Sequence, residues 1–150
     1  MTYLTTLHLE MFLDSAVRLS AAPVLAALPC AGLTSLELTA APLTSADLFA
    51  MLARLPLLAS LTLGKMDQLE SLSCFSDCVA IKATLRKLVF FHCVNLALRL
   101  EELSHLAGFK QLRILVIHDS FRGPLTQAWK QQLTPPSSMF PKLTEFEYAR

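Results

Sequence analysis

The chain has 150 residues, 53% of them hydrophobic and 17% charged, with 13 basic and 12 acidic side chains. This length fits one domain, and a net charge of +1 gives no electrostatic reason to expect nucleic acid or a membrane as a partner. The longest apolar stretch, residues 21–31, contains two prolines and is shorter than the roughly 20 apolar residues of a spanning helix. The amino terminus has no basic region before an apolar one, so we expect no secretory signal and a cytoplasmic or otherwise intracellular protein.

An apolar motif of the form Leu-x-x-Leu-x-Leu recurs along the whole chain. Its six copies are Leu4/Leu7/Leu9, Leu33/Leu36/Leu38, Leu58/Leu61/Leu63, Leu85/Leu88/Phe90, Leu112/Leu115/Ile117 and Leu143/Phe146/Tyr148. The first residues of successive copies lie 29, 25, 27, 27 and 31 positions apart. Alternate side chains of a strand point to opposite faces, so each copy predicts a short strand with one apolar face.

Between the motifs the apolar spacing becomes helical. In the second interval four apolar residues lie at offsets of three and four: Leu48, Met51, Leu52 and Leu55. Thr44 and Asp47 stand where a capping box would begin this helix, with Asp in place of the usual Glu or Gln. The sequence therefore predicts a helix that covers the apolar face of the preceding strand.

Two further helix starts are predicted from single residues. Asn95 precedes residues 96–109, and Pro124 precedes residues 125–133, and both residue types favour the beginning of a helix. Each repeat is therefore predicted to be a strand followed by a helix.

These repeats resemble the leucine-rich-repeat family over essentially the whole chain, because that family opens each repeat of about 20–29 residues with the same motif. A mean spacing near 27 and long intervening helices are similar to the ribonuclease-inhibitor and cysteine-containing types. The resemblance implies an α/β solenoid, a horseshoe segment with a concave parallel sheet and convex helices. We expect residues 1–150 to form a single domain of about six strands that lacks dedicated polar caps.

Repeats of this family usually carry Asn or Cys three positions after the last motif leucine. The equivalent residues here are Phe12, Ala41, Met66, Cys93 and Ser120. Only Cys93 fits, so the usual hydrogen-bonded ladder is not expected, and the turns after the strands are predicted to be irregular.

The cysteines allow two interpretations. Cys74 and Cys78 are four residues apart in an expected helix, and together with the adjacent His92 and Cys93 they could form a zinc site. The chain has no Cys-x-x-Cys pair, however, and neighbouring residues 92 and 93 would point in different directions. We therefore interpret the cysteines as reduced core residues and expect no metal and no cofactor.

Catalysis is not expected. Cys93 could be paired with His105 or His118 as a nucleophile and base, but no nucleophile elbow or family-specific flank surrounds them. The four glycines form no phosphate-binding loop. We expect a protein that is not an enzyme.

The outward positions of the strands define three columns on the concave face of the expected sheet. The first three strands present mainly hydroxyls and carboxylates, whereas the fourth and fifth present Lys87, Val89, Phe91, Ile114, Val116 and His118. Neighbouring strands are about 4.8 Å apart, so the four apolar side chains would form one patch. Covering them would contribute on the order of 6–10 kcal/mol before the costs of association.

This pattern predicts a non-catalytic module that binds a protein partner through the concave face, with those six residues as the binding site. Two alternatives are self-assembly into homo-oligomers through the uncapped ends, and the substrate-recognition part of an F-box-type ubiquitin-ligase receptor. The ubiquitin-ligase alternative rests on the apolar residue and proline that precede a strand, as at Phe140-Pro141, which are similar to the strand entries of such receptors.

Overall fold

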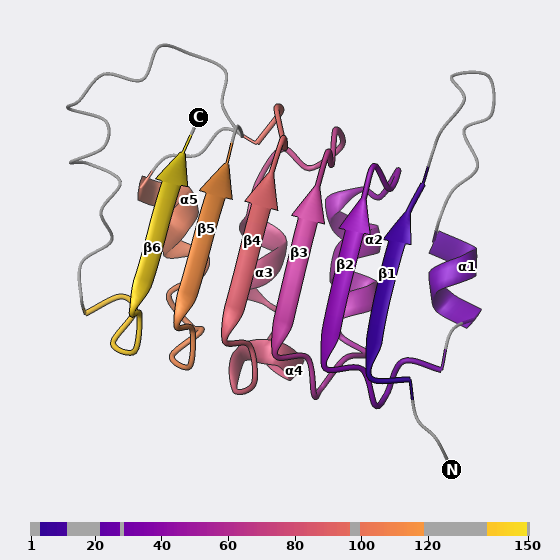
Figure 1. The fold of residues 1–150 in the computed structure, drawn as a ribbon, viewed down its shortest axis with the longest axis horizontal. Helices are drawn as coiled ribbons and strands as arrows, with labels where there is room; N and C mark the ends of the chain where they lie inside the picture. Colours follow the sequence, from indigo (N-terminus) through magenta and orange to yellow (C-terminus); the bar gives the residue numbers. More distant parts are fainter. Residues whose placement is uncertain (1–3, 12–21, 28, 97–99, 119–137, 150) are drawn as a thin grey trace.

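The computed structural model describes residues 4–11, 22–27, 29–96, 100–118 and 138–149. These residues form one six-stranded sheet, in which every strand is parallel to its neighbours and the spatial order follows the chain (Figure 1). The strands are β1 Thr6–Glu10, β2 Ser35–Thr39, β3 Ser60–Gly64, β4 Lys87–Phe91, β5 Ile114–His118 and β6 Glu145–Ala149. The six predicted strands and the α/β class are thus confirmed.

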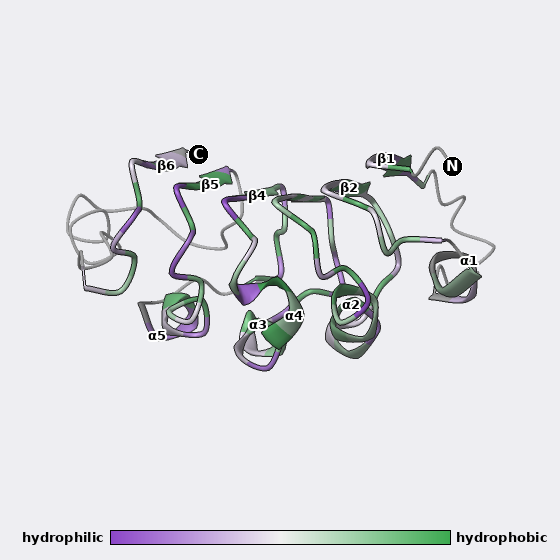
Figure 2. Cartoon of the chain, turned by 90° about the horizontal axis from the view of Figure 1, so that it is seen from below, coloured by the Kyte–Doolittle hydropathy of each residue, from purple (hydrophilic) through white to green (hydrophobic). Residues whose placement is uncertain are grey.

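The described helices cover one face of this sheet. They are α1 Ala22–Ala27, α2 Ser45–Leu52, α3 Ser73–Ser76, α4 Val79–Lys82 and α5 Leu100–Ser104. Viewed along the strands, the sheet curves so that its two ends turn away from the helix layer (Figure 2). We call the face away from the described helices the open face. Within the described ranges, no helix has the length and apolar content that crossing a membrane requires.

The core lies between the two layers and is built from the repeated motif. In β2 to β5 the inward motif residues, from Leu36 to Ile117, are at most 2% exposed. Beneath β4 the ring of Phe75 from α3 packs edge-on against Phe90 and Phe109, with ring centroids 6.2 and 6.1 Å apart. Parallel strands that bury one face against helices need this continuous apolar layer, which the six motif copies supply.

The turns after β2, β3 and β4 are regular, so the prediction of irregular turns was wrong for these three. Ala40, Lys65 and His92 adopt left-handed φ values of 55°, 51° and 52°, and each donates its N–H to the last residue of the next strand at 2.8–2.9 Å. The following residues, Ala41, Met66 and Cys93, are buried. Backbone hydrogen bonds therefore hold these turns, and no side-chain amide is required. The equivalent Phe12 and Ser120 lie outside the described residues.

The predicted capping box is confirmed at the start of α2. The Thr44 side chain accepts from the Asp47 N–H at 3.2 Å, and the Asp47 carboxylate accepts from the Thr44 N–H at 3.1 Å. The helix ends at Leu52, three residues before the predicted Leu55, although Leu55 is still buried.

Two other helix predictions were wrong. Cys74 and Cys78 do not share a helix, because α3 ends at Ser76 and Cys78 lies between α3 and α4. The expected helix over 96–109 is limited to α5 among the described residues. The Asn95 amide does not cap it but donates to the Asp67 carbonyl at 2.6 Å, which links consecutive repeats. The helix predicted at 125–133 lies outside the described residues.

The outermost strands are less well covered than the inner ones. Leu7 and Leu9 in β1, and Phe146 and Tyr148 in β6, are half-buried. Their equivalents in the four inner strands are almost fully buried. The core side chains are therefore most completely buried under the middle of the sheet.

Candidate binding surface

The open face carries the three predicted columns of outward side chains in register. The central column runs His8, Glu37, Thr62, Val89, Val116 and Glu147 across the six strands. The columns before and after it are aligned in the same way, since each strand pairs with the next without a shift. Strand pairing follows the repeat because the apolar face must stay inward, and a one-residue slip would expose it.

The six predicted binding residues come together on β4 and β5. Lys87 pairs with Ile114, Val89 with Val116, and Phe91 with His118. We call the four apolar members, Val89, Phe91, Ile114 and Val116, the apolar patch. All four are half-buried, whereas Lys87 is exposed. Neighbouring side chains already cover part of each of these residues. Burying one of them under a partner would therefore contribute less binding free energy than the about 1.5–3 kcal/mol of complete burial.

Phe91 lies across the neighbouring strand over Gly64. The two residues are directly paired, and a Cβ atom added to Gly64 would overlap the Phe91 ring. Glycine at this position therefore leaves room for the tip of the Phe91 ring against β3. This role of Gly64 was not predicted, although a glycine at a strand end opposite an aromatic residue was a signal for it in the sequence.

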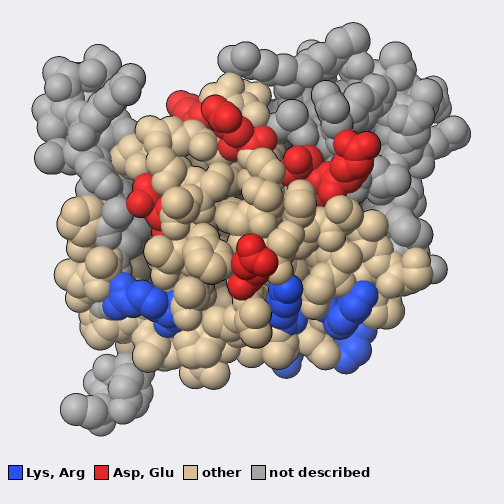
Figure 3. All heavy atoms as spheres, turned by 180° about the vertical axis from the view of Figure 1, so that it is seen from behind, with Lys and Arg blue, Asp and Glu red and all other residues tan. Residues whose placement is uncertain are grey.

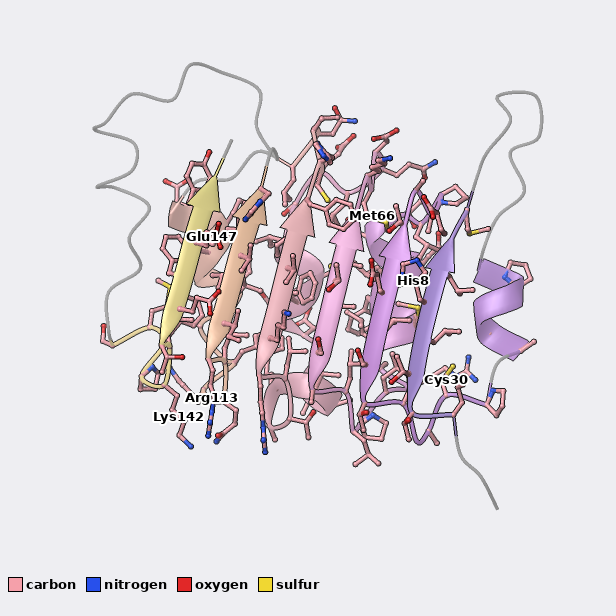
Figure 4. The ribbon with its side chains drawn as sticks, in the orientation of Figure 1. His8, Cys30, Met66, Arg113, Lys142 and Glu147 are labelled. Carbon is pink, nitrogen blue, oxygen red and sulfur yellow. The ribbon has the colours of Figure 1, made fainter. Side chains whose placement is uncertain are left out.

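Two histidine–glutamate pairs lie toward the two ends of the open face. His8 on β1 contacts Glu37 on β2, with Nδ1 and Oε2 3.0 Å apart, and His118 on β5 contacts Glu147 on β6, with Nε2 and Oε1 3.2 Å apart. Figure 4 shows His8 and Glu147 on their strands. The second pair borders the apolar patch, so His118 contributes a polar contact at its rim and joins β5 to β6.

Basic side chains lie beside the patch, where the strands begin. Arg86 and Arg113 immediately precede β4 and β5, and both are exposed, as is Lys87. We call these three residues the basic edge. Seen from the helix side, Lys and Arg lie along this edge and Asp and Glu lie mainly toward the other (Figure 3). Arg86 and Arg113 were not among the predicted binding residues, although their equivalent positions in consecutive repeats can be seen in the sequence.

The cysteines do not form a reactive or metal-binding group in the described structure. All four are free, and only Cys74 is not fully buried. Burial raises the pKa of Cys74 to about 12, with a further contribution from nearby Cys78, and it raises the pKa of Cys78 and of Cys93 to about 11. The described residues hold no cluster of three or more His, Cys, Asp or Glu side chains that could bind a metal.

The residues considered for catalysis have structural contacts. The Cys93 thiol donates to the carbonyl of Leu63 at 3.5 Å, and its raised pKa keeps it protonated and a poor nucleophile. His105 on α5 lies on the helix side, where its Nδ1 is 2.6 Å from the Ser76 hydroxyl. These contacts link successive repeats to one another.

Comparisons with known proteins do not identify the chain. No family model matches it, and no curated protein matches it. The surface described above is therefore interpreted from its own geometry and chemistry.

Proposed function

We propose that this chain is a leucine-rich-repeat solenoid that binds a protein partner through the open, concave face of its sheet and catalyses no reaction. Six parallel strands in chain order, an unshifted register and recurring turns support the repeat architecture. We also propose an intracellular location, which four cysteines without a disulfide support.

The observation that carries this proposal is the apolar patch. Four apolar side chains from two adjacent strands form one continuous surface on a face that no described helix covers. Contiguous apolar surface of this kind commonly marks a protein interface. Aromatic residues, Phe among them, are also enriched in the buried centres of protein interfaces.

The experiment compares two substitutions in the same column of the open face. Binders are selected on the full chain from a displayed library of the source organism's protein fragments. Their affinity is then measured for the unchanged chain, for Val116→Asp and for Thr62→Asp. We expect Val116→Asp to weaken binding by about tenfold or more, because it puts a charge into an apolar contact.

Thr62→Asp is the comparison at the rim of the patch, since Thr62 is also half-buried and lies two strands from Val116 in the same column, where it pairs with Val89. We expect it to weaken binding less than Val116→Asp does. Thermal unfolding of both variants verifies the fold. Binders that tolerate Val116→Asp as well as Thr62→Asp would contradict the proposal.

The outer strands support a second candidate, end-to-end self-association. Leu7 and Leu9 on β1 and Phe146 and Tyr148 on β6 are half-buried, and a second copy would cover them by continuing the sheet. Light scattering over a dilution series tests this candidate. A mass that falls with dilution supports it, and a constant monomer mass rejects it.

A further inference from the structure

We infer that the partner is an extended protein segment that combines an apolar anchor with acidic side chains, the anchor covering the apolar patch and the carboxylates pairing with the basic edge. This inference rests on the proposed binding function and adds the chemical class of the partner.

The basic edge is built by the repeat itself. The Arg86 carbonyl accepts from the N–H groups of Arg113 and Ile114 at 2.8 and 3.0 Å, so the two arginines are neighbours at equivalent positions. Lys87 follows Arg86 and is paired with Ile114 of the apolar patch. Three exposed cations therefore adjoin the apolar side chains on the same two strands.

The other half of the face lacks this combination. The positions that match Arg86 and Arg113 are occupied in the first three repeats by Thr5, Thr34 and Ala59. The positions that match Lys87 in the same three repeats carry hydroxyl side chains, as at Ser60. Charge and apolar surface thus coincide on β4 and β5 and nowhere on β1 to β3.

Neither of the two histidine–glutamate pairs on the open face includes a residue of the basic edge. Glu145 pairs with Ile114 across the β5–β6 boundary and is the carboxylate of the first column. Glu147 is engaged with His118 at 3.2 Å. Both lie on β6, so the acidic groups border the patch on one side while the cations border it where the strands begin. Figure 4 shows Arg113 and Lys142 at that edge.

The dimensions suit an extended segment. Lys87 and Phe91 are the first and last residues of β4, and at about 3.3 Å per residue they are separated by roughly 13 Å. An extended partner that places an apolar side chain near Phe91 would reach the basic edge about four residues away. Arginine also binds carboxylates through two parallel hydrogen bonds, which makes an acidic partner specific as well as attractive.

The test selects short random peptides, displayed without bias in composition, on the full chain. We expect the enriched peptides to carry Asp or Glu a few residues from Leu, Ile, Phe or Trp. A second selection uses the double variant Arg86→Glu/Arg113→Glu, for which we expect Lys or Arg to replace the acidic residues. Peptides selected on the unchanged chain are expected to bind the double variant about tenfold more weakly, and raised salt is expected to reduce this difference.

Lys87→Glu and Lys65→Glu provide the matched pair for single charges. Both lysines are exposed, but Lys65 lies just after β3 at the opposite edge. We expect weaker binding of the acidic peptides with Lys87→Glu and no change with Lys65→Glu.

The outcomes separate this inference from the proposed function. Peptides that depend on Val116 but show no acidic preference, or that are unaffected by Arg86→Glu/Arg113→Glu, overturn the inference and leave the proposed function standing. Acidic peptides that bind equally well to Val116→Asp indicate a purely ionic surface and overturn both. Failure to enrich any peptide also counts against both.

Discussion

The two halves of the open face have the same backbone and different chemistry. β1 to β3 present mainly hydroxyls and carboxylates, whereas β4 and β5 present the apolar patch beside the basic edge. Their register is unshifted throughout. The inward residues therefore maintain the sheet, while the outward residues can differ between repeats without disturbing it.

The halves also differ beneath the sheet. Phe75, Phe90 and Phe109 form an aromatic cluster under the apolar half. The core below β2 and β3 consists largely of leucines, among them Leu48 and Leu52 of α2. The apolar half therefore rests on larger side chains whose edge-to-face contacts have a preferred geometry.

The largest effect is expected from Phe75→Ala, which removes the centre of the aromatic cluster. We expect it to lower the free energy of unfolding by about 3–5 kcal/mol, because a large buried side chain leaves a cavity. Denaturant unfolding measures this loss. Val79→Ala on α4 is the control, since Val79 is 75% exposed and its truncation is expected to cost less than about 0.5 kcal/mol. Equal effects of the two substitutions would mean that the aromatic cluster does not stabilise the apolar half.

A smaller loss of stability is expected when the pH is raised into the alkaline range. The pKa of the Cys93 thiol is raised from 9.0 to about 11, mainly by burial, so the folded chain holds this proton after the unfolded chain has lost it. The contribution of the Cys93 thiol to the free energy of unfolding is fully present below pH 9 and is lost between pH 9 and 11. This is a decrease on the order of 2 kcal/mol.

Unfolding by denaturant across this pH range gives the measurement, and Cys93→Ala provides the control. Alanine occupies the equivalent position at Ala41, so the turn accepts it. We expect a flatter pH dependence in the variant. If the free energy of unfolding of Cys93→Ala falls as steeply at alkaline pH as that of the unchanged chain, the effect comes from other ionisable groups.

The smallest change in stability is expected from Gly64→Ala, at the boundary between the two halves. The added methyl group would overlap the Phe91 ring, and the ring can swing outward, so the cost is expected to be below the about 1–3 kcal/mol of overpacking in a closed core. Binding of selected partners is expected to weaken more than stability. Unaltered partner affinity would show that the position of the Phe91 ring does not matter for binding.

Much of the framework was predictable from the sequence. The strand positions followed from the recurrence of Leu-x-x-Leu-x-Leu, and the start of α2 followed from Thr44 and Asp47. Helix lengths were predicted less well, as at 96–109, because apolar spacing extends beyond a helix wherever buried turns also need apolar side chains.

Within the candidate site, the sequence predicted the columns and the apolar patch, because strand geometry alone decides which residues face outward. It did not reveal that Phe91 lies over Gly64, that Asn95 reaches the Asp67 carbonyl, or that backbone bonds make the turns regular. Those features depend on groups about 27 residues apart in the chain, a distance set by the repeat.

The number of strands, their spacing and their inward faces follow from the amino-acid sequence, since alternation of apolar residues is a local property with one favourable burial pattern. How neighbouring repeats meet follows from the folded chain: the unshifted parallel register, the left-handed turns, and the juxtaposition of the basic edge with the apolar patch. These contacts form between repeats, so the stacking of the repeats selects the partner of each residue, and its neighbours in the sequence do not.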